Sequence, residues 1–218
     1  MSESFDLKTI EKKAFRATYQ DGLWDIYEGG TVLCMSFLAY TTASEAKPLL
    51  RFGLFMAGLC LFYFIFWGGK KYITTPRMGQ VKFGPQRQRR KLIMTSVLAG
   101  IVLLQVILLV GTFLLWKNPG WATDLGLYTT NRDLERMVVA VIGALFVGPS
   151  MVLLAYFKDF LRGYYIAIVT AVAVFALIWF GQPVYLIIAG LLIMIPGVVL
   201  FVRFLREHPL PPAEASHD

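Results

Sequence analysis

The chain has 218 residues, of which 57% are hydrophobic and only 16% are charged. Soluble domains carry about 25% charged residues, so this composition excludes an ordinary soluble domain. The 21 Lys and Arg residues exceed the 14 Asp and Glu residues, which gives a net charge of +7. Several uncharged stretches reach the length of about 20 apolar residues that spans a bilayer. The sequence therefore predicts an all-α polytopic membrane protein.

The first segment, residues 1–22, is too charged to cross a membrane. Leu7, Ile10 and Ala14 recur there at helical spacing, opposite charged side chains. This pattern predicts a short amphipathic helix over residues 5–20 that lies along the lipid headgroups. The segment lacks the apolar core of a cleaved signal peptide, so we expect it to remain as a cytoplasmic or interfacial segment.

The remainder is expected to form one transmembrane domain, residues 23–204, built from six helices. Each helix is an apolar run long enough, at 1.5 Å per residue, to cross roughly 30 Å of hydrocarbon. The six runs cover about residues 23–42, 49–69, 92–116, 137–157, 163–181 and 183–204. The polar and proline-rich residues 205–218 are predicted to form a disordered cytoplasmic tail.

Lys and Arg collect in one connecting segment, residues 70–91, which contains no acidic residue. Its eight cations are Lys70, Lys71, Arg77, Lys82, Arg87, Arg89, Arg90 and Lys91. Basic loops are retained on the cytoplasmic side, so this loop should lie inside the cell. Six helices then place both termini in the cytoplasm. The predicted outer loop, residues 117–136, agrees because its acidic residues balance its basic residues.

Three acidic residues mark the entry into the first predicted helix: Asp21, Asp25 and Glu28. Their offsets of four and three residues place them on one helical face near the cytoplasmic edge of the membrane. An acid that faces lipid is unfavourable, so we expect this face to contact protein. Three interpretations stay open. Arg77 or a neighbouring cation pairs with Asp25 or Glu28, the acids form an entry point for a cation or proton, or they contact a separate subunit.

The basic loop also carries turn residues. Pro76, Gly79, Gly84 and Pro85 predict an ordered and partly extended loop rather than a helix. Basic side chains at a membrane surface attract anionic headgroups. We therefore expect the loop to contact anionic membrane lipid or a protein partner, and not nucleic acid, since no recognition module accompanies the charge. The cations expected to make these contacts are Arg77, Lys82, Arg87, Arg89 and Arg90.

Two prolines fall inside predicted helices, Pro149 in the fourth and Pro196 in the sixth. A proline removes one helical hydrogen bond, so both positions are expected helix breaks. We interpret these prolines first as packing kinks, and the alternative is a transport site near the membrane midplane, which paired broken helices can mark. Small residues four apart, such as Ala144 with Gly148, indicate closely packed helices or a dimer.

The sequence contains no catalytic motif, cofactor-binding motif or metal-ligand spacing. We therefore expect a protein that is not an enzyme and that uses no cofactor or metal. The leading hypothesis is a scaffold or accessory subunit that acts through helix contacts and the basic loop, as a homo-oligomer or with another membrane protein. Two alternatives stay open. One is a small transporter or channel-like protein with a site near the fourth and sixth helices, and the other is a lipid-modifying enzyme.

Two stretches carry a resemblance to a family. DGLWDIYEGG, residues 21–30, and TTPRMGQVKF, residues 74–83, resemble the DGLxDIxxG and PRxGxVxF elements of uncharacterised multi-spanning membrane proteins of prokaryotes. The resemblance covers mainly residues 15–91. It implies a six-helix fold in the prokaryotic cytoplasmic membrane and brings no known activity.

Overall fold

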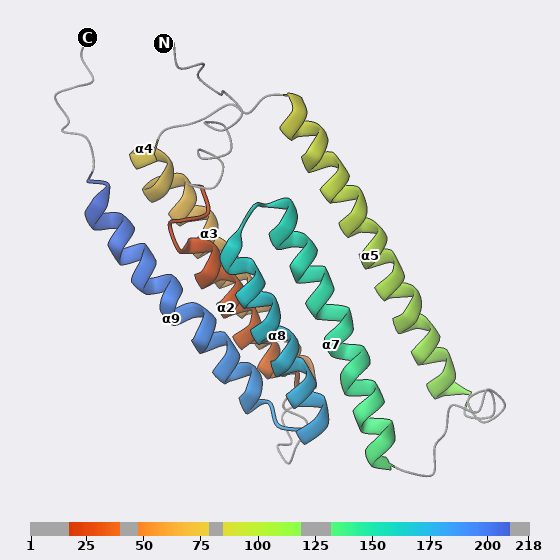
Figure 1. The fold of residues 1–218 in the computed structure, drawn as a ribbon. Coiled ribbons are helices and arrows are strands. Elements are labelled where there is room, and N and C mark those ends of the chain that lie inside the picture. Colours follow the sequence, from red (N-terminus) through yellow and green to blue (C-terminus); the bar gives the residue numbers. More distant parts are fainter. Residues whose placement is uncertain (1–17, 40–47, 79–84, 119–131, 210–218) are drawn as a thin grey trace, which may run out of the picture. The chain divides into compact units, whose positions relative to one another are not determined.

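The computed structural model describes residues 18–39, 48–78, 85–118 and 132–209, and every regular element in these ranges is a helix (Figure 1). The elements are α2 (Leu23–Ala39), α3 (Pro48–Gly68), the π-helix η1 (Gly69–Thr74), α4 (Thr75–Met78), α5 (Pro85–Lys117), α7 (Arg132–Phe157), α8 (Leu161–Phe180) and α9 (Val184–Glu207). The predicted all-α class is confirmed for these residues. Most of the predicted amphipathic N-terminal helix, of the predicted tail and of the predicted outer loop lies outside them. The start of the predicted disordered tail is corrected, because residues 205–207 belong to α9.

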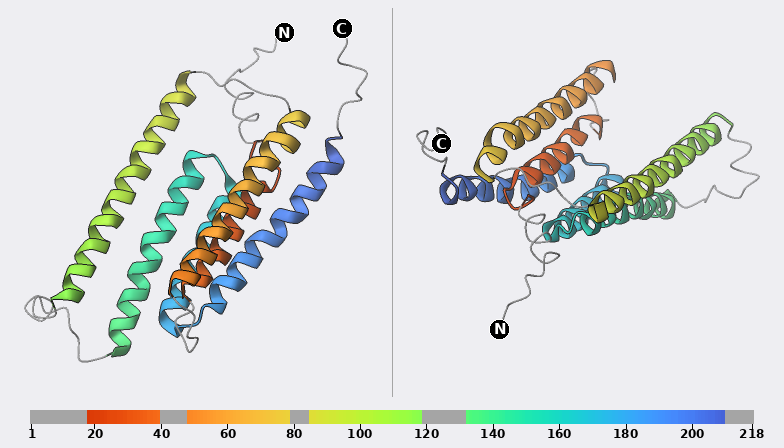
Figure 2. Two further views of the ribbon diagram at one scale, coloured as in Figure 1. Left: turned by 180° about the vertical axis from the view of Figure 1, so that it is seen from behind. Right: turned by 90° about the horizontal axis from the view of Figure 1, so that it is seen from above.

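The helices group into two compact units. Unit 1 contains α2, α3, η1, α4 and α9, and unit 2 contains α5, α7 and α8. In unit 1, α2 lies between α3 and α9 and runs antiparallel to both, as the view from above in Figure 2 shows. The start of α2, the end of α4 and the end of α9 therefore lie at the same end of unit 1.

Glycines set the distance between α2 and α9. A Cβ atom on Gly29 would lie 2.8 Å from the carbonyl oxygen of Gly190, and one on Gly197 would lie 2.9 Å from the amide nitrogen of Ile26. Gly22 has a φ of +77° and would place a Cβ 2.3 Å from the carbonyl oxygen of Gly197. Backbone thus meets backbone at two levels, seven residues apart on each helix. Small residues allow such close approach between membrane helices.

The opposite side of α2 packs on α3 through two contacts, in each of which a larger side chain of one helix lies against a glycine of the other. The ring of Phe62 occupies the space at Gly30, where a Cβ would lie 2.3 Å from its Cδ1 atom. The sulfur of Cys34 lies against Gly58 in the same way, at 2.4 Å from an ideal Cβ. Cys34 is 1% exposed in consequence, whereas Cys60 on α3 is exposed. These contacts fix the rotation of α2 relative to α3.

Unit 2 is built on the antiparallel pair of α7 and α8, and α5 contacts α7. Ala171 approaches Gly148, where a Cβ would lie 3.2 Å from the Ala171 Cβ, and Ile178 fills the gap beside Gly143. The small residues that the sequence marked in these two helices therefore pack helix against helix within one chain. Gly181 ends α8 in the left-handed conformation, with its N–H donating to the carbonyl of Leu177 at 2.8 Å.

Four helical stretches of the described residues are long and apolar enough to cross a membrane: Leu49–Met78, Arg136–Phe157, Leu161–Phe180 and Val184–Glu207. Each coincides with a predicted span, which supports an integral membrane protein. The first predicted span corresponds to α2, of which the structure describes 17 residues. The third corresponds to α5, a helix of 33 residues whose described apolar stretch is Leu92–Leu108.

The expectation of a loop rather than a helix over residues 70–91 is wrong for the residues that the structure describes. Residues 70–78 and 85–91 are helical, because η1 and α4 continue α3 and because α5 already begins at Pro85. Proline suits a first helical turn, and the Gln, Arg and Lys residues that follow are good helix formers. The predicted extended piece, residues 80–83, lies outside the described residues.

The expected helix breaks do not interrupt either helix, and a kink at each proline stays a prediction. Both α7 and α9 continue through their prolines, Pro149 and Pro196. Next to Pro149, the hydroxyl of Ser150 donates to the carbonyl oxygen of Phe146 at 2.7 Å, which adds a side-chain bond beside the missing backbone bond. Such side-chain bonds help membrane helices to tolerate an internal proline.

Candidate functional site

Asp21 is the most deeply buried acidic side chain in the described residues, with 0% of its surface exposed. It precedes α2, and one carboxylate oxygen, Oδ1, accepts from the backbone N–H of Leu23 at 3.3 Å. The other oxygen, Oδ2, accepts from the ammonium of Lys70 at 2.7 Å and from the hydroxyl of Thr74 at 2.8 Å. We call Asp21, Lys70 and Thr74 the Asp21 cluster. It joins the start of α2 to η1.

Lys70 is held by more than the carboxylate. Its ammonium also donates to the carbonyl oxygen of Thr18, and it lies 6.0 Å from the ring centroids of Tyr19 and Phe66. The side chain is 19% exposed. A buried carboxylate is tolerated when it is paired and its remaining lone pairs accept hydrogen bonds, and the Asp21 cluster meets both conditions.

The π-helix places Lys70 and Thr74 on the face that meets Asp21. Within η1, the carbonyl oxygen of Lys70 accepts from the backbone N–H of Thr75, five residues on, and from the Thr75 hydroxyl at 2.7 Å. The wide turn lies directly before Pro76, which has no N–H to donate. Gly69 begins the turn with its Cα against the side chain of Leu23, where a Cβ would be 2.9 Å from Leu23 Cδ1. Single π-turns inside α-helices recur at functional sites.

The other two acids lie on α2 and are also buried. Asp25 is 4% exposed and Glu28 is 6% exposed. The Cβ of Asp25 lies against α9, 2.8 Å from where a Cβ on Gly197 would be. The predicted protein-facing stripe is therefore seen for Asp25 and Glu28. Asp21 differs from the prediction because the positive φ of Gly22 separates it from the helix.

The sequence expected Arg77 or a neighbour to pair with Asp25 or Glu28. The structure shows an ion pair between this acidic stretch and the following basic segment that the sequence did not predict, between Asp21 and Lys70. One guanidinium nitrogen of Arg77, Nη1, donates to the carbonyl oxygen of Ile73 at 3.3 Å. Pairing of Arg77 with Asp25 or Glu28 stays a prediction.

The cations of the expected lipid or partner loop are placed unevenly. Arg77 is half-buried on α4, and Arg89 is exposed on α5. Arg87 and Arg90 belong to α5, but their side chains lie outside the described part of the structure, and Lys82 lies outside it altogether. Arg77 belongs to unit 1, whereas Arg87, Arg89 and Arg90 belong to unit 2, and a shared lipid or partner surface of these cations stays a prediction.

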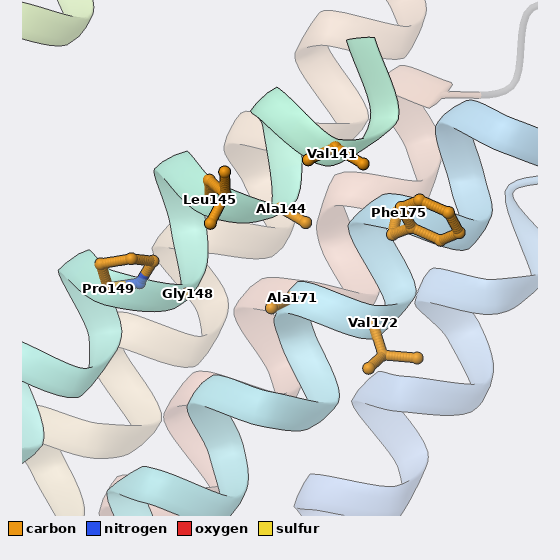
Figure 3. A pocket seen from close by; sticks show the side chains of 8 residues that line it. All are labelled: Val141, Ala144, Leu145, Gly148, Pro149, Ala171, Val172 and Phe175. Atoms are coloured by element: carbon orange, nitrogen blue, oxygen red, sulfur yellow. The ribbon is translucent and has the colours of Figure 1, made fainter. Parts of the chain in front are cut away.

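An open groove of about 400 Å³ lies on unit 2 between α7 and α8 (Figure 3). Its lining contains Pro149, one of the two prolines near which the transporter alternative places its site. All of the lining residues are apolar: Val141, Ala144, Leu145, Gly148, Pro149, Ala171, Val172 and Phe175. The hydroxyl of Ser150 is committed to its own helix. The groove thus offers a hydrocarbon surface and no ligand for an ion or polar solute.

The described residues contain no group of three His, Cys, Asp or Glu side chains placed to hold a metal ion. The hydroxyl of Thr170 is buried and has no hydrogen-bond partner among the described residues. A single hydroxyl of this kind does not form a reaction centre.

Sequence reasoning missed Lys70 and Thr74 as the partners of Asp21, although Lys70 belonged to the basic segment. The available signal was the spacing of four residues between them, which places two donors on one face once the segment is helical. No protein-family model, no curated protein and no solved structure matches the chain. Function is therefore inferred from the residues and their geometry.

Proposed function

We propose that the chain is a six-helix integral membrane protein that acts as a non-enzymatic scaffold or accessory subunit. The observation that carries this proposal is the Asp21 cluster, in which a buried acid of the entry segment is bound by Lys70 and Thr74 of the same chain. A carboxylate with both oxygens occupied by structural donors stabilises a helix junction. The wholly apolar groove beside Pro149 gives the transporter alternative no support.

The proposed orientation has both termini in the cytoplasm. Basic residues at one end of unit 1 support it. The end at which α2 starts and α9 ends carries Lys70, Lys71, Arg203 and Arg206. The positive-inside rule assigns that end to the cytoplasm. The resemblance of DGLWDIYEGG and TTPRMGQVKF to prokaryotic sequences favours the prokaryotic cytoplasmic membrane.

Orientation is tested with single cysteines in a protein that carries Cys34→Ala and Cys60→Ser. Arg89→Cys reports the predicted inner side and Asp133→Cys the predicted outer side, and both native side chains are exposed. A membrane-impermeant maleimide should label Asp133→Cys in intact cells and Arg89→Cys only after lysis. Labelling of Arg89→Cys in intact cells would refute the proposed orientation.

The scaffold role is tested by extraction in polymer-bounded nanodiscs, which keep neighbouring lipid and protein in place. The mass of the extracted particle should exceed that of one chain with its annular lipid, because a scaffold exists to hold a second copy or a different subunit. Proton and potassium flux into proteoliposomes should equal that of empty vesicles. A solitary chain, or a flux above the empty-vesicle control, would contradict the proposal.

A further inference from the structure

Two neighbouring lysines of η1 have opposite environments. Lys70 binds Asp21 in the interior of unit 1, whereas the side chain of Lys71 is exposed. The ammonium of Lys71 lies 4.7 Å from the ring centroid of Trp67 and 5.2 Å from that of Tyr72. Within the described part of the chain, no carboxylate lies within ion-pair distance of this ammonium. Among the described residues, the side chains that position the ammonium of Lys71 are therefore these aromatic rings.

The two rings form the walls of this position. Trp67 and Tyr72 meet edge to face, with centroids 6.4 Å apart and planes at 89°. Both rings are themselves accessible, at 47% and 66% of their surfaces. A cation over an aromatic face is attracted by the ring quadrupole, and the contact reduces the freedom of a long side chain. The charge of Lys71 is thereby held in place while its outward N–H donors stay accessible.

We propose that Lys71, Trp67 and Tyr72 bind the phosphate of an anionic membrane phospholipid. The inference rests on the proposed orientation, which puts the end of α3 at the inner headgroup level. Trp and Tyr favour that level because they combine an apolar ring with a polar group. A Lys near an anionic leaflet contributes roughly 1 kcal/mol to lipid attraction. The site lies in the basic segment that the sequence predicted to contact anionic lipid, but the cations singled out there began at Arg77 and did not include Lys71.

The neighbouring lysine cannot serve in its place. The donors of Lys70 are directed to Asp21 and to the carbonyl oxygen of Thr18. A phosphate would have to replace a buried carboxylate that is itself bonded to Thr74. The geometry thus separates a structural lysine from a lipid-binding lysine at adjacent positions.

The test is a titration of the purified full-length protein in mild detergent with phosphatidylglycerol, read by native mass spectrometry. Lys71→Gln should weaken binding about fivefold, the factor that corresponds to roughly 1 kcal/mol, and Lys71→Arg should retain it. Arg206→Gln is the matched control, because it removes one exposed positive charge at the same end of unit 1. Arg206→Gln should leave the binding of phosphatidylglycerol at the site unchanged. An added zwitterionic lipid should likewise fail to displace phosphatidylglycerol from the site.

Several results would overturn the site. Equal phosphatidylglycerol binding by Lys71→Gln and the unaltered protein would do so, as would an equal loss in Arg206→Gln, which would indicate unspecific charge. Competition by millimolar inorganic phosphate would identify free phosphate as the ligand. Because Lys71 is exposed, the melting temperature of Lys71→Gln should stay unchanged, and Tyr72→Phe supplies a second variant that keeps the ring. Failure of the orientation is recognised separately, since Lys71→Cys in the cysteine-free protein would then be labelled in intact cells.

Discussion

Gly29 of α2 and Gly190 of α9 stand in reciprocal backbone contact, since a Cβ on either residue would lie 2.8 Å from the carbonyl oxygen of the other. Neither neighbour is the mobile end of a side chain, so the contact cannot adjust without a shift of a whole helix. The same relation recurs at Gly22 and Gly197. The α2–α9 pair is thus held at two levels by the absence of side chains.

Gly190→Ala should destabilise the protein by about 1–3 kcal/mol, the usual range for overpacking a close-packed interior. The added methyl would meet the carbonyl oxygen of Gly29 and the amide nitrogen of Leu33, at 2.8 and 2.9 Å. Thermal unfolding in detergent, followed by size-exclusion chromatography, measures the effect.

Gly100→Ala is the matched control for the glycine contact. Beyond the local backbone of α5, no atom of the described residues lies within 4 Å of a Cβ at that position, and alanine is the better helix former. Its melting temperature should equal or exceed that of the unaltered protein. If Gly190→Ala melts together with Gly100→Ala, the close contact between α2 and α9 is refuted.

Asp21→Asn should lower stability by about 3–5 kcal/mol, the cost of removing one partner of a buried ion pair. Lys70→Met removes the other partner, and the double variant should lose less than the two single losses combined because it leaves no unpaired charge. Thr74→Val removes one hydrogen bond and should cost about 1 kcal/mol. Unfolding of the four variants provides the measurement, and strictly additive losses would show that Asp21 and Lys70 are not coupled.

The two cysteines should differ in reactivity. Cys34 is enclosed between α2 and α3, whereas Cys60 is exposed on α3 and would face lipid in the proposed membrane arrangement. In Cys34→Ala, a lipophilic maleimide should modify the single remaining thiol of Cys60 rapidly. In Cys60→Ser, the thiol of Cys34 should react only after denaturation.

A charged, water-soluble maleimide tests the membrane placement of α3 with the same two variants. It should leave both thiols unmodified in intact membranes, since neither is expected to meet water. Modification of Cys60 by this reagent would show that residue 60 does not lie in the hydrocarbon layer.

The apolar runs could be read from the sequence because a membrane helix needs a continuous length of apolar side chains, and α2 begins at the predicted Leu23. The irregular segments could not. Turn residues suggested a loop from Lys70 onward. In the structure the π-turn places Pro76 in the first turn of the short helix α4, where its missing N–H does not interrupt the helix. The local sequence does not show that the wider turn of η1, with one extra residue, lets α3 continue into α4.

The acidic stretch was predictable in its environment and not in its partners. Burial of Asp25 and Glu28 followed from the cost of exposing acids to lipid. The pairing of Asp21 with Lys70 depends on the positive φ of Gly22 and on the wide turn of η1, and both are set by tertiary contacts. The glycines of α2 indicated a close neighbour, but nothing local identified α9 as that neighbour.

The pairing of α2 with α9 also orders the events of biosynthesis. Most of the chain lies between the two helices, so α2 leaves the ribosome long before Gly190 and Gly197 exist. Until then, the surface of α2 that carries Asp25 lacks the backbone that later covers it. Among the described helices, the first to be synthesised is therefore the one whose final burial waits for the last, and a nascent chain stopped before Val184 holds α2 without its partner α9.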